Sequence, residues 1–192
     1  MTGNQFLPSG IDALDRQLFG GYPAGSVVLL VGSPVSGLEL IAKQFCRNDS
    51  DAVYLMMGSE TEEGMINGRE MDVDECLAAC TGTRNVVDSV TTLSDRCGRE
   101  ETLRFLQTIR QRLRTSGGVL IGTLYPGVLL PLTEALVLRS ADIVIECSVI
   151  DHANSISRTC VVRKKTGEVQ DQILQYVVKE QGIEMVPTER VA

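Results

Sequence analysis

The sequence has little of what histidine chemistry or a metal site requires. Its one histidine, His152, lies in a polar stretch that we expect to be an exposed turn. Acid–base catalysis by histidine is therefore not expected. The six cysteines are scattered; Cys76 and Cys80 would share one helix face, but no further ligands accompany them. Because a zinc site needs at least three protein ligands, we predict no metal site.

Long apolar runs are also missing. The most apolar stretch, residues 128–138, is interrupted by Pro131 and Glu134 and is too short to cross a membrane. The amino terminus, Met-Thr-Gly-Asn-Gln, lacks the basic and apolar regions of a signal peptide. We therefore expect a cytoplasmic protein with no membrane partner.

Positive charge is scarce as well. The net charge is −7 and the sequence pI is about 4.8. Lysine occurs only at Lys43, Lys164, Lys165 and Lys179. An acidic surface repels the phosphates of nucleic acids, so nucleic acid is not an expected partner.

The most informative motif that is present covers residues 32–39. Its glycines have the spacing of a phosphate-binding P-loop, G-x-x-x-x-G-K-[ST], in which a lysine contacts phosphate and a hydroxyl binds Mg²⁺. Leu38 stands at the lysine position and Glu39 at the hydroxyl position. The motif therefore predicts a phosphate-binding frame that has lost its charged and metal-binding side chains. The candidate cofactor-binding residues are Gly32, Ser33, Pro34, Val35, Ser36, Gly37, Leu38 and Glu39.

The flanking residues supply the structural context of a P-loop. Residues 26–31 form a continuous apolar run, which predicts a strand buried on both faces. After the loop, Leu40, Ile41 and Phe45 recur at helical spacing. In the first turn of that helix Glu39 would meet the positive end of the helix dipole. We hypothesise that Glu39 acts there as a built-in substitute for phosphate.

The segment before the loop resembles a known superfamily. Residues 7–15, LPSGIDALD, and residues 19–29, FGGYPAGSVVL, resemble the entry sequence of RecA-superfamily ATPases of the KaiC, RadA and gas-vesicle-regulator type. That entry reads [ST]-G-hydrophobic-x-x-Leu-Asp and then Gly-Gly-x-Pro-x-Gly. The resemblance continues, less closely in the middle, to the terminal Gly-Ile-Glu-Met-Val-Pro at 182–187.

The resemblance implies further site residues. The family's water-activating glutamate aligns with Ser59, so that only the second acidic residue of the pair survives, as Glu60. Asp88 follows a short apolar run as the Walker B aspartate does, although a strand-end aspartate without a metal role fits equally well. Arg163 and Lys165 match the basic residues that reach a neighbouring subunit's nucleotide; the alternative is a solvated hairpin end.

We predict a single RecA/KaiC-like domain over residues 1–192, of the α/β class, with a mostly parallel central sheet flanked by helices and a C-terminal β-hairpin. The strands are expected at 26–31, 52–57, 85–88, 119–123 and 141–147. The helices are expected at 38–47, 72–80, 99–115 and 129–138, with a short one between the acidic segment and Asn67-Gly68. The hairpin is expected to join 158–164 to 172–178 around Thr166-Gly167.

The function that follows is a catalytically impaired KaiC/RecA-like homologue, acting as a regulatory or assembly subunit. Nucleotide binding is expected to be weak or lost, since Val35 also replaces the family's mid-loop glycine. No cofactor is certain; the resemblance implies ATP with Mg²⁺. The expected partner is a second copy of the chain or an active RecA-like paralogue.

Two other functions stay open. One is an active ATPase with an unconventional P-loop, in which Glu60 is the base, Asp88 binds Mg²⁺, and Arg163 or Lys165 acts from a neighbouring subunit. The other is a paralogue that mediates DNA recombination. It would need a basic loop after residue 123 or 147, and neither segment carries one.

Overall fold

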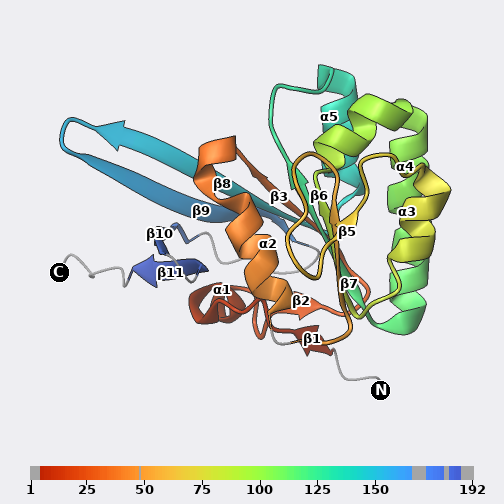
Figure 1. The fold of residues 1–192 in the computed structure, drawn as a ribbon. Helices are drawn as coiled ribbons and strands as arrows, with labels where there is room; N and C mark the ends of the chain where they lie inside the picture. Colours follow the sequence, from red (N-terminus) through yellow and green to blue (C-terminus); the bar gives the residue numbers. More distant parts are fainter. Residues whose placement is uncertain (1–4, 48, 166–171, 180–181, 187–192) are drawn as a thin grey trace.

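The computed structural model describes residues 5–47, 49–165, 172–179 and 182–186 (Figure 1). Within these residues nine strands form one sheet in the order β11-β10-β9-β8-β3-β7-β6-β4-β5. The parallel strands are β3 (Val27–Gly32), β4 (Ala52–Met56), β5 (Ile66–Asn67), β6 (Arg84–Asp88), β7 (Val119–Leu124) and β8 (Ile143–His152). The antiparallel strands are β9 (Ser155–Lys165), β10 (Leu174–Lys179) and β11 (Gly182–Val186). The predicted α/β class and mostly parallel sheet are confirmed.

Helices cover both faces of the sheet (Figure 1). One face carries α1 (Asp12–Gln17) and α2 (Leu38–Cys46), and the other carries α3 (Val73–Ala79), α4 (Val90–Ser116) and α5 (Pro131–Ser140). A separate two-stranded ribbon joins β1 (Phe6–Leu7) to β2 (Tyr22–Pro23). In the described part of the chain, no helix has both the length and the apolar character that a membrane crossing requires.

The position of β3 between two layers of helices explains why its sequence is apolar throughout. Val28 and Leu30 pack with α1 and α2, whereas Val27 and Leu29 pack with the helices of the opposite face. All six residues of β3 are buried. The strand therefore fixes the start of α2 and the loop between them firmly against both layers.

Three predicted elements differ from the structure. No helix follows the acidic segment, because Gly64 has φ 83 and Ile66 instead pairs with Leu55 at the edge of the sheet. A helical segment that was not predicted begins at Val90, where Ser89 caps it by accepting a hydrogen bond from the Thr92 N–H. Gly98, at φ 80 and ψ 170, separates this segment from the predicted long helix, which continues to Ser116.

The third difference is an arm formed by β8 and β9. The strand predicted to end at residue 147 continues to His152 and pairs with β9 from Ser155 onward. This hairpin extends beyond the body of the molecule (Figure 1). Its polar tip resembles a loop in sequence because neither face of the arm is buried. The predicted pairing of β9 with β10 is confirmed at Cys160 and Leu174, whereas Thr166-Gly167 lies outside the described residues.

Candidate functional site

The phosphate loop is a closed turn at the carboxyl end of β3. A 3-10 turn spans Pro34–Ser36, and Gly37 follows with φ 81 before α2 begins. Ser36 donates two hydrogen bonds to the Ser33 carbonyl, from its N–H at 3.0 Å and from its hydroxyl at 2.6 Å. The Tyr176 hydroxyl, from β10, donates to the Ser36 carbonyl at 2.7 Å. The Ser36 N–H is therefore committed within the loop.

The glycine frame has a steric reason. A Cβ on Gly32 would lie 2.6 Å from the Cys147 carbonyl oxygen and 2.7 Å from the Ser36 hydroxyl. Val35 needs no left-handed backbone, because it sits inside the 3-10 turn, and its side chain is 67% exposed. The loop thus keeps the glycines that close packing requires and accommodates valine by adopting a helical turn.

The two substituted positions face different surroundings. Leu38 is 1% exposed and packs in the core under α2. Glu39 is half-buried and lines a cavity of 420 Å³ together with Asp88. No hydrogen bond of Glu39 to the loop occurs among the described residues, so its role as a phosphate substitute stays a hypothesis.

Asp88, the aspartate that the sequence matched to a Walker B strand, lines the same cavity as Glu39. It ends β6, is 5% exposed, and sits between the neighbouring strands β7 and β4. Its Oδ1 accepts a hydrogen bond from the Thr123 hydroxyl at 2.6 Å, and its Oδ2 accepts one from the Tyr54 hydroxyl at 2.7 Å. Both carboxylate oxygens are therefore engaged by protein hydroxyls.

Two tyrosines close to Asp88 have raised pKa values. Burial, followed by the charge of Asp88, raises the pKa of Tyr54. Burial, followed by Asp88 and Glu39, raises the pKa of Tyr125 to about 12. Both tyrosines thus stay protonated at neutral pH, and Tyr54 stays a hydrogen-bond donor to Asp88.

Two further charged residues line the same cavity, Lys43 from α2 and Glu62 from the acidic segment after β4. The Lys43 Nζ lies 2.6 Å from Oε1 of Glu62. This ion pair was not predicted from the sequence. Lys43 could have been found from its place four residues after Glu39, which puts both on one helix face, but nothing local connects it to Glu62.

The remaining candidate residues lie elsewhere. Glu60 is exposed and does not line the cavity. Arg163, on β9, forms an exposed ion pair with Glu146 at 2.6 Å. Lys165 ends β9, and its side chain lies outside the described residues. The structure thus brings Asp88 and Glu39 together and leaves Glu60 and Arg163 outside this cavity.

The donor set bears on Mg²⁺, the metal that a P-loop implies. Carboxylate oxygens of Glu39 and Asp88 are the hard ligands that Mg²⁺ takes, and water commonly completes its shell. The described residues contain no group of three or more histidine, cysteine or acidic side chains placed to bind a metal. These residues therefore fit Mg²⁺ that arrives with a phosphate ligand and keeps most of its water. Such an ion would supply charge neutralisation.

Comparison with known proteins concerns the fold as a whole. A family model described as a family of unknown function (DUF7125) matches residues 6–67. No curated protein matches the sequence. A KaiC-like protein from Pyrococcus horikoshii has a similar structure, with a TM-score of 0.80 and 18% identity over 96% of this chain and 100% of that one.

The flagellar accessory protein FlaH from Methanocaldococcus jannaschii is also similar, with a TM-score of 0.74 and 16% identity over 92% of this chain and 96% of that one. At such identities the likeness concerns the fold. The mostly parallel central sheet flanked by helices agrees with the fold that the sequence resemblance implied. The chain therefore has the RecA-like P-loop fold of KaiC-like proteins.

Proposed function

We propose that this chain is a catalytically impaired KaiC/RecA-like protein that acts as a regulatory or assembly subunit and binds nucleotide weakly or not at all. One observation carries the proposal. The loop is closed by the hydrogen bonds of Ser36, and its two functional positions are a core leucine and an acidic residue facing the cavity. Each lost charge-assisted contact to phosphate removes about 1.5–3 kcal/mol of binding free energy.

Calorimetric titration of the full chain with Mg-ATP tests the nucleotide part of this proposal. We expect no measurable heat at micromolar nucleotide and no rise in thermal unfolding temperature, because two phosphate or metal contacts are absent. The same titration without Mg²⁺ is the control. Micromolar binding would contradict the proposal and favour the active ATPase, which a turnover assay would then examine.

The assembly role is supported by apolar side chains around the site. The loops at the carboxyl ends of β3 and β7 expose Val35 and Leu130, and the arm at the end of β8 exposes Ile150. These strands are neighbours in the order β8-β3-β7, so all three side chains follow the carboxyl ends of adjacent strands, with Ile150 on the arm. Exposed apolar side chains at this end of the sheet favour a protein partner there. We propose a second copy of the chain.

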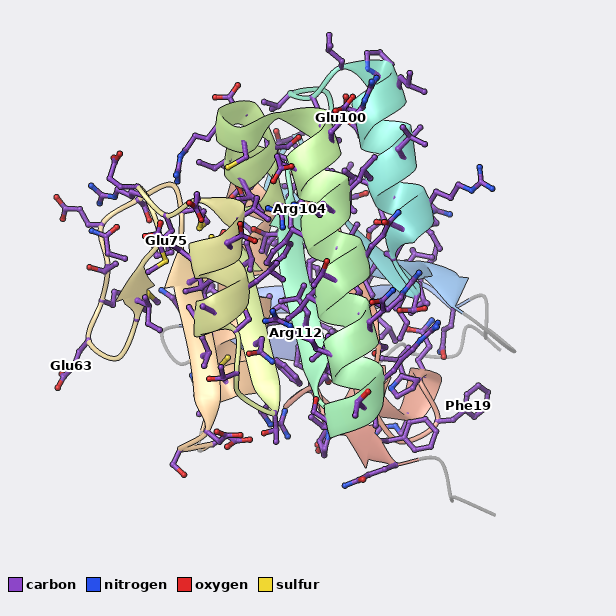
Figure 2. The ribbon with its side chains drawn as sticks, turned by 90° about the vertical axis from the view of Figure 1, so that its right-hand side faces the viewer. Phe19, Glu63, Glu75, Glu100, Arg104 and Arg112 are labelled. Atoms are coloured by element: carbon purple, nitrogen blue, oxygen red, sulfur yellow. The ribbon has the colours of Figure 1, made fainter. Side chains whose placement is uncertain are left out.

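Light scattering across a concentration series tests this partner. The parent chain should associate, and Leu130→Asp should weaken association by roughly tenfold or more, because a charge would replace a side chain that is 76% exposed. Phe19→Gly is the control, since Phe19 lies at the opposite end of the molecule from Glu100, which neighbours Leu130 (Figure 2). A parent that stays monomeric at every concentration would leave the paralogue as the partner to seek.

A further inference from the structure

The cavity beside the phosphate loop is lined by a positively charged side chain, that of Lys43. Among the described residues lining that cavity, no other lysine or arginine occurs. Lys43 lies on α2, one helical turn beyond Glu39, and its side chain is 29% exposed. Because the backbone of Lys43 is held in α2, the positions that its ammonium group can reach are limited. The cavity thus has a cation of its own although the P-loop lysine position is occupied by leucine.

The ammonium group of Lys43 is held by an acidic residue of the same chain. Glu62 belongs to the segment after β4, and its side chain is 64% exposed. Exposed ion pairs of this kind shift an equilibrium by roughly fivefold or less. Glu62 is therefore a competitor that a ligand of sufficient charge can displace, and its segment lies at the rim of the cavity.

Opposite charges meet in this cavity. Lys43 stands on the α2 side, while Glu39 and Asp88 are carboxylates lining the same space. A phosphate without a metal ion would be attracted by Lys43 and repelled by the two carboxylates. A metal ion without a phosphate would be attracted by the carboxylates and repelled by Lys43. A phosphate chelated to Mg²⁺ carries both charges and suits both groups.

We propose that Lys43 is the phosphate-binding residue of this cavity, for a Mg²⁺-chelated diphosphate or triphosphate group, and that Glu62 masks it. This inference rests on the proposed function, because it says what limits nucleotide binding once the P-loop lysine is lost. Ligand binding moves the Lys43 ammonium from Glu62 to phosphate oxygens. Glu62 then turns outward into solvent, to which it is already exposed.

The test measures binding of pyrophosphate, with Mg²⁺, to the parent chain and four variants by calorimetry and by thermal unfolding. Glu62→Gln should bind roughly three- to tenfold more tightly than the parent, because it removes the competitor and one negative charge. Glu63→Gln changes an acidic residue of the same segment that is also exposed and has no ion pair in the described chain, and it should match the parent. Glu62→Gln combined with Lys43→Gln should lose the gain, and Lys43→Arg in that background should keep most of it.

Equal affinities of the Glu62→Gln and Glu63→Gln variants would overturn masking. If Lys43→Gln, added to Glu62→Gln, left pyrophosphate binding undiminished, the role of Lys43 would be overturned. Pyrophosphate binding below detection in all variants would overturn it too. Pyrophosphate without Mg²⁺ should bind more weakly; unchanged binding would remove the metal from the proposal. Micromolar binding of Mg-ATP by the parent would refute the proposed function, yet the order of the variants would still decide the role of Lys43.

Discussion

Replacing Leu38 by lysine and Glu39 by threonine together should raise the affinity for Mg-ATP by roughly a hundredfold or more. The change restores one charge-assisted phosphate contact and one metal-binding hydroxyl, each contributing about 1.5–3 kcal/mol. It also removes a carboxylate from the cavity that a triphosphate would enter. Calorimetry of the double variant beside the parent measures the gain.

The same double substitution should also lower the stability of the folded chain. Leu38 is 1% exposed in the core, so a lysine there forfeits about 2–3 kcal/mol of apolar burial unless its ammonium reaches the cavity. We therefore expect the double variant to unfold at lower urea than the parent. Mg-ATP should recover part of the loss, since a ligand that binds the folded state stabilises it.

Two comparisons separate these effects. Leu38→Met keeps the apolar volume and should leave both stability and nucleotide binding near those of the parent. Glu39→Thr alone should raise affinity modestly without the cost in stability. A double variant as insensitive to Mg-ATP as the parent would show that the closed turn of Ser33 and Ser36, rather than the two side chains, prevents binding.

Phe45→Ala should lower the free energy of unfolding by about 3–5 kcal/mol. Phe45 lies near the end of α2, is 1% exposed, and belongs to the core between this helix and the sheet. Its ring packs edge-on against Tyr22, with the ring centroids 5.4 Å apart. The guanidinium carbon of Arg84 lies 4.6 Å from the Phe45 ring centroid, and Arg84 also donates a hydrogen bond to the Phe45 carbonyl. Urea denaturation followed by circular dichroism measures the loss.

Phe19 provides the matched control for Phe45. Its side chain projects at the margin of the molecule (Figure 2). It is 48% exposed and has φ 62, a backbone conformation that suits glycine and strains phenylalanine. Phe19→Gly should leave stability within about 1 kcal/mol of the parent, toward greater stability, because relief of strain outweighs the entropy of glycine. A loss at Phe19 comparable to that at Phe45 would contradict the placement of these two rings.

The fold was predictable where a local pattern has one structural solution. The apolar run of β3, the glycine turn and the spacing of Ile41 and Phe45 specify strand, loop and helix within twenty residues. The same logic placed Asp88 at a strand end. It failed for the acidic segment and for the arm, because β5 and the outer part of β8 and β9 are defined by pairing rather than by burial.

The features of the candidate site likewise fall into those that the local sequence specifies and those that only the packed structure specifies. Neighbouring residues alone showed that the lysine and hydroxyl of a P-loop are absent, since residue identity at fixed spacing settles that question. Only the packed structure placed Leu38 in the core, supplied Tyr54 and Thr123 to Asp88, and brought Glu62 to Lys43. Each of those contacts joins segments 19 to 35 residues apart or depends on which helix face meets the sheet. Such contacts follow from sheet order and helix rotation, which arise when the whole core packs and leave no mark on local spacing.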